Sequence, residues 1–157
     1  MTAYEPWSAQ RAAAVIEAHR HAPGATLPVL HALQQAFGHI PRDAVVMVAE
    51  ALNLSRADVW GVVTFYHDFR TEPAGRHVLK LCRAEACQAM GAEAMAARAM
   101  ARLGVDWGGT TADGRVTLEP TFCLGLCAVS PAAMLDGEVR GRLDERALDR
   151  LMAEAQS

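Results

Sequence analysis

The sequence lacks the motifs by which chains of this size bind nucleotides or nucleic acids. It contains no Gly-x-Gly-x-x-Gly and no Gly-x-x-x-x-Gly-Lys segment. Lys80 is the only lysine among 15 basic residues, the formal net charge is -3, and the basic residues form no tract. We therefore expect no motif-based binding of NAD, flavin or nucleotide phosphate, and no nucleic acid partner.

The chain also lacks the long hydrophobic runs that a membrane requires. No run of about 18 apolar residues occurs. Residues 1–7 show neither the basic region nor the apolar core of a secretory signal. These absences predict a cytoplasmic protein without direct membrane insertion, in a compartment where disulfides are uncommon.

A recognisable catalytic constellation is missing as well. No Ser-His-Asp arrangement has motif support, and the histidines are scattered along the chain, which favours surface or core positions for them. They are His19, His21, His31, His39, His67 and His77. We predict no catalytic residue in this chain, and whether it is part of an enzyme depends on its partners.

What the chain does have is four cysteines, which fall into two pairs within one stretch. Cys82 and Cys87 stand in C-x4-C, and Cys123 and Cys127 stand in C-x3-C, with 35 residues between the pairs. No cysteine is left over, which indicates one site with four thiolates. Two iron ions bridged by two sulfides need four thiolates, two for each iron.

Two other interpretations of the cysteines remain open from the spacing alone. Structural zinc also takes four thiolates, usually with shorter spacing inside each pair, so that a zinc-binding assembly module is an alternative. A pair of disulfides is a further possibility, which a cytosolic chain makes uncommon. The spacing favours an iron–sulfur cluster over zinc only modestly.

Residues 1–70 show the periodicity of four short amphipathic helices, which we expect to form a helical bundle. The 157 residues are 52% hydrophobic, enough for one ordinary domain or two small ones. The expected helix starts are a cap at Ser8, a cap at Thr26, Pro41, and a capping box formed by Ser55 and Asp58.

The pattern changes after the turn-forming residues 71–75, which we interpret as a linker. Residues 76–157 read as strand, helix, strand, hairpin and helix, the order of a small α/β domain. The expected elements are a strand over 77–82, a helix over 88–103, a strand over 115–119, a hairpin turn at Asp136-Gly137 and a closing helix from a cap at Asp144 to Ala153.

The cysteine motifs carry a family resemblance. Cys-x4-Cys followed by Cys-Leu-Gly-x-Cys-Ala-x-x-Pro resembles the thioredoxin-like [2Fe-2S] ferredoxins, in particular the small [2Fe-2S] subunits of complex I, NAD-dependent formate dehydrogenases and NAD-reducing hydrogenases. Residues 81–91, Leu-Cys-Arg-Ala-Glu-Ala-Cys-Gln-Ala-Met-Gly, are most similar to gamma subunits of molybdenum-containing, NAD-dependent formate dehydrogenases. With Gly61 to Tyr66, the resemblance spans about residues 10 to 152.

This resemblance implies a helical bundle followed by a thioredoxin-like domain that holds a [2Fe-2S] cluster with Cys82, Cys87, Cys123 and Cys127. It also implies a non-catalytic electron-transfer subunit, whose partners are a flavin- and NAD-binding subunit and a molybdenum-containing catalytic subunit. The equivalent subunit of complex I or of an NAD-reducing hydrogenase is the alternative, and a free-standing shuttle ferredoxin is another.

Further expectations concern the surroundings of the cysteines and the aromatic residues of the helical region. We expect each cysteine pair to lie on a loop, and Gly125 to leave space beside the sulfides and tolerate positive φ. Arg83 would favour the reduced cluster and Glu85 would oppose it; the alternative is that both side chains point into solvent, where screening leaves little effect. The aromatic residues of 61–69 are expected in the core, with a contact surface for a larger subunit as the alternative.

Overall fold

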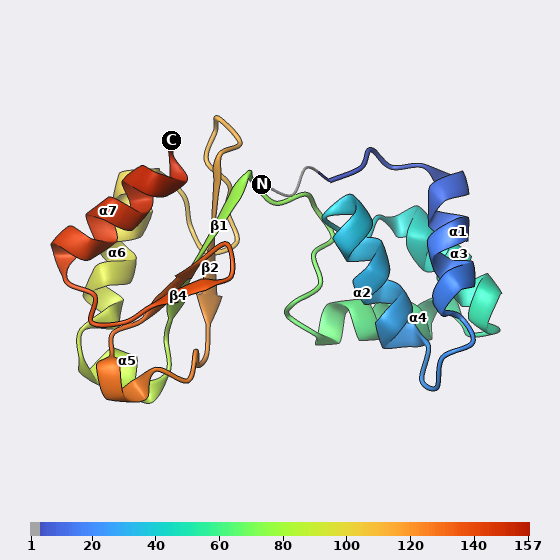
Figure 1. Cartoon of the computed structure of the whole chain (residues 1–157), viewed down its shortest axis with the longest axis horizontal. Helices are drawn as coiled ribbons and strands as arrows, with labels where there is room; N and C mark the ends of the chain where they lie inside the picture. The colour runs from blue at the N-terminus through green and yellow to red at the C-terminus, as the bar shows by residue number, and fades with distance from the viewer. Residues whose placement is uncertain (1–3) are drawn as a thin grey trace. The chain divides into compact units, whose positions relative to one another are not determined.

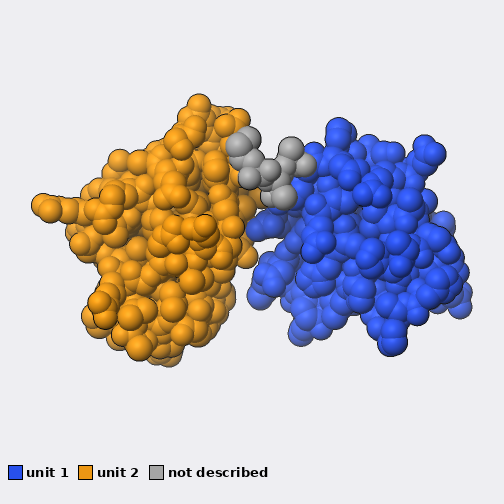
Figure 2. Space-filling view, viewed as in Figure 1, with its two compact units in different colours: residues 1–73 blue, residues 74–157 orange. Residues whose placement is uncertain are grey.

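The computed structural model describes residues 4–157, which divide into two compact units, residues up to 73 and residues 74–157 (Figure 2). The division lies inside the expected 71–75 segment. The backbone N–H of Gly75 donates to Thr117 Oγ1 at 2.7 Å, so Gly75 is already tied to the second unit. Within the described part of the chain, no helix is both long and apolar enough to cross a bilayer.

The first unit is a bundle of four helices, α1 (Ala9–His19), α2 (Thr26–Phe37), α3 (Arg42–Leu52) and α4 (Arg56–Phe65) (Figure 1). Each helix turns one stripe inward. The shared core comprises Ala12, Val15, Ile16, Val29, Leu30, Leu33, Phe37, Ile40, Ala44, Val45, Val48, Ala49, Val59, Val63 and Phe69. Full burial of one such Leu or Val contributes about 1.5–3 kcal/mol, which explains why four short helices hold together as a group.

The helix starts follow the sequence signals with one exception. Ser8 accepts a hydrogen bond from the Arg11 N–H at 3.4 Å, and Ser55 forms both halves of a capping box with Asp58. The expected cap at Thr26 is wrong, because Ala25 occupies the cap position in an already helical conformation and Thr26 is the first helical residue. A side-chain cap requires an extended backbone at that point.

The aromatic residues after α4 divide between core and surface. Phe69 is 8% exposed and packs on the His31 ring, whereas Phe65 is 75% and Tyr66 44% exposed. Core packing was therefore the wrong expectation for Phe65 and Tyr66. The buried stripe of α4 is Val59 and Val63, so Phe65, two positions beyond Val63, lies on the opposite side of the helix, and Tyr66 follows the helix in an extended conformation.

The second unit is built on a mixed four-stranded sheet with the order β2-β1-β3-β4 (Figure 1). Its strands are β1 (His77–Cys82), β2 (Val116–Thr121), β3 (Ala133–Leu135) and β4 (Glu138–Arg140). β1 and β2 run parallel, whereas β3 is antiparallel to both of its neighbours. The hairpin between β3 and β4 turns at Asp136-Gly137, with φ of 51° and 92°, as its sequence predicts.

The helices of this unit are α5 (Glu85–Ala89), α6 (Ala92–Leu103) and α7 (Glu145–Ala155), with a single 3-10 turn, η1 (Cys127–Val129). The expected continuous helix over 88–103 is wrong at its start. Gly91 adopts a left-handed conformation with φ of 90° and separates α5 from α6. The bundle followed by an α/β unit is the fold class that the sequence predicts.

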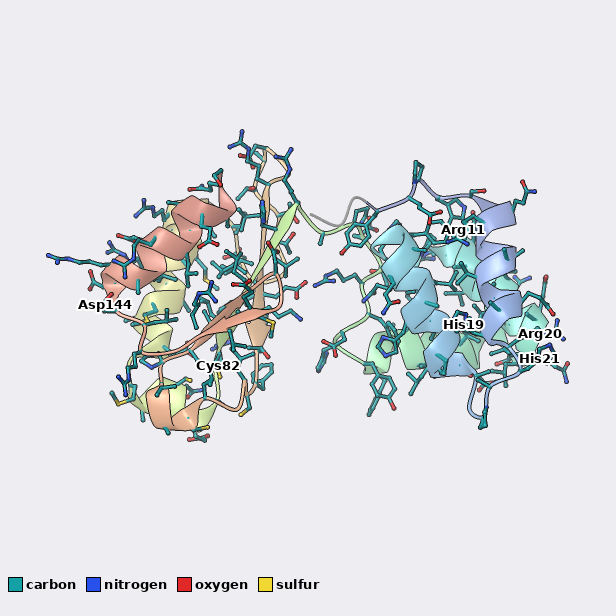
Figure 3. All side chains as sticks on the ribbon, viewed as in Figure 1. Arg11, His19, Arg20, His21, Cys82 and Asp144 are labelled. Carbon is teal, nitrogen blue, oxygen red and sulfur yellow. The ribbon has the colours of Figure 1, made fainter. Side chains whose placement is uncertain are left out.

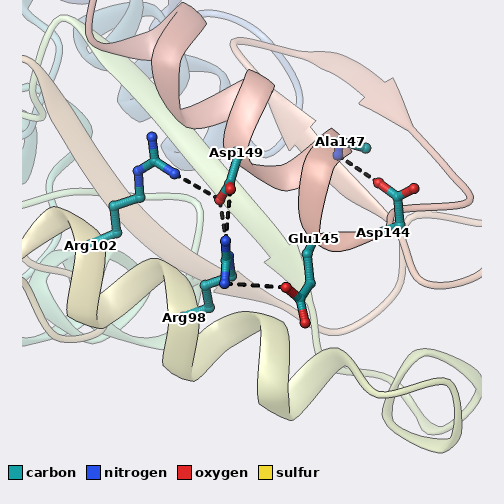
Figure 4. Close-up of polar contacts among 6 residues, drawn as sticks. All are labelled: Arg98, Arg102, Asp144, Glu145, Ala147 and Asp149. Atoms are coloured by element: carbon teal, nitrogen blue, oxygen red, sulfur yellow. Dashed lines mark hydrogen bonds and ion pairs between the residues drawn. The ribbon is translucent and has the colours of Figure 1, made fainter.

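An ion-pair network joins α6 to α7, which lie together on one side of the sheet (Figures 1 and 4). Arg98 donates two hydrogen bonds to Asp149 at 3.0 and 2.7 Å and pairs with Glu145 at 3.3 Å, while Arg102 pairs with Asp149 at 2.9 Å. The hydrogen bond from Arg98 holds the pKa of Asp149 below its ordinary value. Asp144 caps α7 by accepting from the Ala147 N–H at 2.6 Å.

Candidate metal centre

The four cysteines lie on different kinds of backbone. Cys82 is the last residue of β1, Cys87 lies within α5, Cys123 follows β2 in an irregular segment, and Cys127 is the first residue of η1. The expectation that each pair lies on a loop is therefore wrong for Cys82 and Cys87. Each pair instead uses a short helical turn at its second cysteine, and α5 places Cys87 in the buried interior.

The parallel pairing of β1 and β2 brings the two cysteine motifs to one end of the sheet. Cys82 lies opposite Thr121, and the Arg83 N–H donates to Thr121 O at 2.7 Å. Because the carboxyl ends of parallel strands meet at the same edge, the chain leading into Cys123 leaves the sheet beside Cys82. Figure 3 labels Cys82 at this end of the second unit.

A small apolar cluster joins the two motifs through side chains. Cys82 and Cys87 are 3% and 2% exposed and pack with Ala92 and Ala132. Leu124 and Leu126, the neighbours of Gly125 between the second pair of cysteines, pack against the same cluster. Segments about 40 residues apart in the sequence therefore share one packed region around the thiols.

The four thiol groups interact with one another. Burial raises the pKa of the Cys87 thiol, and its hydrogen bond with Cys82 raises it further. The hydrogen bond with Cys123 is the largest cause that raises the pKa of Cys127, and repulsion from Cys82 adds to it. The raised pKa values favour the neutral thiols at Cys87 and Cys127, and binding of a metal centre, which requires thiolates, would release their protons.

A backbone N–H group points at one of the cysteine sulfurs. The Gly125 N–H donates to Cys123 Sγ at 3.3 Å, and the backbone of Ala132 offsets part of the rise in the pKa of Cys87. Gly125 has a φ of 75°, which agrees with the positive φ expected of this glycine. Hydrogen bonds to ligand sulfurs stabilise added negative charge at an iron–sulfur centre.

The donor set fits a two-iron cluster in its chemistry. Among residues 4–157, no group of three or more His, Cys, Asp or Glu side chains gathers as a single metal ion would need. A [2Fe-2S] cluster asks for a different arrangement, with two thiolates at each iron and sulfides between the irons. The two cysteine pairs agree with this requirement in number and chemical type, so Cys82, Cys87, Cys123 and Cys127 would hold such a cluster.

One side of the centre is buried and the other faces solvent. Cys82 and Cys87 are buried, whereas Cys123 and Cys127 are exposed. Phe122, directly before Cys123, is 65% exposed. A cluster held by these residues would be shielded on the sheet side and open for electron exchange on the other.

Two residues that contact Arg83 are not foreseen by the sequence. Arg83 donates two hydrogen bonds to Glu93 at 2.9 and 3.0 Å, and its guanidinium lies 5.3 Å from the centre of the Trp107 ring. Glu93 is ten positions further along the chain and beyond the Gly91 break, so no helical spacing links it to Arg83. Only the fold brings these residues together.

Comparison with known proteins agrees with this geometry. The profile of the family "Thioredoxin-like [2Fe-2S] ferredoxin" matches residues 12–156. The NADH-quinone oxidoreductase of Escherichia coli strain K12 has a subunit that is 34% identical over 152 residues, covering 96% of this chain and 92% of that protein. NADP-reducing hydrogenase subunit HndA of Solidesulfovibrio fructosivorans is 32% identical over 139 residues, covering 88% and 81%.

A solved structure shares the fold of nearly the whole chain. The NAD+-reducing [NiFe]-hydrogenase in its air-oxidized state superposes with a TM-score of 0.72 at 28% sequence identity. The match covers 89% of this chain but only 24% of the hydrogenase chain, so this protein spans about a quarter of that chain's length.

Proposed function

Because the chain belongs to the thioredoxin-like [2Fe-2S] ferredoxin family, whose members carry a [2Fe-2S] cluster, we propose that it is an electron-transfer subunit of an NAD-dependent oxidoreductase complex. The observation that carries this proposal is the meeting of two cysteine motifs at one end of the sheet, half buried and half exposed. The cluster supplies one-electron chemistry without a proton, and the chain supplies its ligands and surroundings.

The proposed ligands are Cys82, Cys87, Cys123 and Cys127. The chain also provides the surroundings of the cluster: the N–H of Gly125 donates to Cys123 Sγ, and the surrounding apolar side chains restrict water on the buried side. Both effects act on the energy of the added electron, because hydrogen bonds and solvent exposure set the reduction potential of such centres.

The proposed partner is a flavin- and NAD-binding subunit, which exchanges electrons with this cluster in the cytoplasm. The finer proposal is an NAD-dependent formate dehydrogenase, with formate oxidised at molybdenum in another subunit. Its support is the resemblance of the segment 81–91 to gamma subunits of that enzyme. The alternative is that this chain is the equivalent subunit of an NADH-quinone oxidoreductase or of an NADP-reducing hydrogenase. Its support is that the two relatives are named as subunits of those enzymes.

A tagged full-length chain purified from its native cells tests the assignment. We expect a brown complex that contains flavin and molybdenum and that reduces NAD+ with formate. A complex that instead oxidises NADH with quinone, or reduces NAD+ with hydrogen, would replace the formate assignment by one of the alternatives. A colourless protein with one zinc ion per chain would overturn the electron-transfer proposal itself, because zinc has no redox chemistry.

A further inference from the structure

We propose that Glu93 and Arg83 form a charge-balancing pair in which Glu93 cancels the rise in the cluster's reduction potential that Arg83 alone would cause, with Trp107 holding Arg83 in place. The inference rests on the proposed function, because it assumes a cluster held by Cys82 and its partner cysteines. It assigns a role to Glu93, a residue outside both cysteine motifs, and it replaces the simple expectation that Arg83 acts as a free positive charge.

Arg83 occupies a fixed position between the segments that carry the first two ligands. It directly follows Cys82, and its N–H donates to Thr121 O at 2.7 Å. Its carbonyl oxygen accepts a hydrogen bond at 2.8 Å from the side chain of Gln88, the residue after Cys87. The backbone at Arg83 is therefore held from both sides, so its side chain leaves the site in a defined direction.

The side chain of Arg83 is held at its charged end. Its two hydrogen bonds to Glu93 use both carboxylate oxygens, the planar arrangement that makes Arg–carboxylate pairs the most directional ion pairs in proteins. The guanidinium also lies over the Trp107 ring, and the side chain is 29% exposed. Glu93 stands in the first turn of α6, where the helix dipole favours a negative charge.

The charge balance has a direct consequence for reduction. Reduction adds one electron, and therefore one negative charge, to the centre. A lone Arg83 would stabilise the reduced state, but a carboxylate bound to it at 2.9 Å cancels most of its field. Removing Glu93 should therefore uncover the positive charge and raise the potential, whereas removing Arg83 should leave Glu93 uncompensated and lower it.

The test is a redox titration of the full-length chain, with dithionite as electron donor, mediators in solution and the reduced cluster followed by electron paramagnetic resonance. We expect Glu93→Gln to shift the midpoint potential upward and Arg83→Gln to shift it downward. The double variant should return close to the wild-type value. Arg83→Lys keeps the charge without the planar fork and should stay closer to wild type than Arg83→Gln.

The matched control is Glu145→Gln, because Glu145 is also a surface glutamate paired with an arginine of α6, Arg98 at 3.3 Å. Its potential should stay at the wild-type value. An equal shift in Glu145→Gln would overturn the proposal in favour of a general net-charge effect, and unchanged potentials in both Glu93→Gln and Arg83→Gln would overturn it outright. If Glu93→Gln does not take up a cluster, Arg83→Gln alone tests the proposal: a lower midpoint potential supports it, and an unchanged one overturns it.

Failure of this inference is separable from failure of the proposed function. Iron, sulfide and the visible spectrum of the wild-type chain are measured first. A wild-type chain without a [2Fe-2S] cluster rejects the proposed function. A wild-type chain with its cluster, but with variants that show no opposite shifts, rejects only the role of Arg83 and Glu93.

Discussion

The two units of the chain solve the problem of burial in different ways. The first unit packs the apolar stripes of four helices into one core and leaves Phe65 and Tyr66 at its surface. The second unit packs two helices on a sheet to form its main core. A separate, smaller group of buried side chains surrounds Cys82 and Cys87. The first unit exposes Phe65 and Tyr66, whereas the second exposes Cys123 and Cys127 together with the neighbouring Phe122. We therefore expect the second unit to hold the cluster and the first unit to present an apolar surface to a partner.

The largest effect is expected from replacing one cysteine of the second unit, which tests whether that unit holds the cluster. Cys82→Ser should abolish or severely weaken cluster binding, because a hydroxyl replaces one of four thiolates and the residue is buried among apolar neighbours. Iron and sulfide per chain, together with the visible spectrum, measure the effect. Met90→Leu, an exposed change three residues after Cys87, should keep about two irons and two sulfides per chain. Full cluster content in Cys82→Ser would exclude Cys82 as a ligand.

The second prediction separates the units physically. A fragment of residues 74–157 should assemble the cluster, since all four cysteines lie in it. It should not co-purify with the flavin-binding subunit, because we expect the helical unit to be the docking element. In the full chain, the exposed pair Phe65→Ser and Tyr66→Ser should reproduce the loss of partner without changing the cluster spectrum or the melting temperature.

The controls for this division use the same two readouts. Phe69→Ser alters a buried aromatic residue next to the exposed pair and should lower the melting temperature, unlike the surface changes. A fragment that is insoluble or takes up no iron would mean that the two units are not independent domains. A fragment that joins the complex at full occupancy would refute the docking role of the helices.

The third prediction compares the stability of the two cores by replacing one buried leucine with alanine in each. Leu33 and Leu118 are each 0% exposed, one in the helical core and one in the sheet core. Replacing either with Ala should cost about 2–5 kcal/mol of unfolding free energy. Calorimetry should show Leu33→Ala destabilising the helical unit with an unchanged cluster spectrum, and Leu118→Ala destabilising the unit that carries the cluster. Equal loss of cluster in both variants would show that the units share their stability.

The smallest expected effect concerns the ion pairs between α6 and α7. The pKa of Asp149 is lowered in the folded chain, so its pairing stabilises the second unit above the ordinary Asp range, about pH 4. That contribution is lost as the pH falls from this range through the folded pKa. Asp149→Asn should therefore lower the melting temperature slightly at pH 7 and show less difference from wild type near pH 3.

Arg98→Gln is the matched change for Asp149→Asn, because it removes the other half of the same pair. The double variant should lose less stability than the sum of the two single variants, because both remove the Arg98–Asp149 pair, while Asp149→Asn also removes the pair with Arg102 and Arg98→Gln the pair with Glu145. The unfolding of the helical unit should be the same in all of them. A change in that transition would contradict an effect confined to the second unit.

The sequence predicted the fold class and most of the helices and strands because their signals are local. Ser55 and Asp58 form the capping box that their spacing predicts, and Asp136-Gly137 makes the expected hairpin turn. The Thr26 cap failed because its position depended on the conformation of the preceding turn. The continuous helix over 88–103 failed because Gly91 can adopt a left-handed backbone, which alanine-rich neighbours do not reveal.

The amino-acid sequence by itself determined the number and pairing of the cysteines, and through them the chemistry available to the site. Only the tertiary structure decided how the pairs meet, because that depends on the parallel register of β1 and β2 and on the packing of Leu124 and Leu126. The Arg83–Glu93 pair and the exposure of Phe65 also follow from the fold. The sequence specifies which chemical groups the chain contains and how they are spaced, whereas long-range packing specifies which of them are in contact.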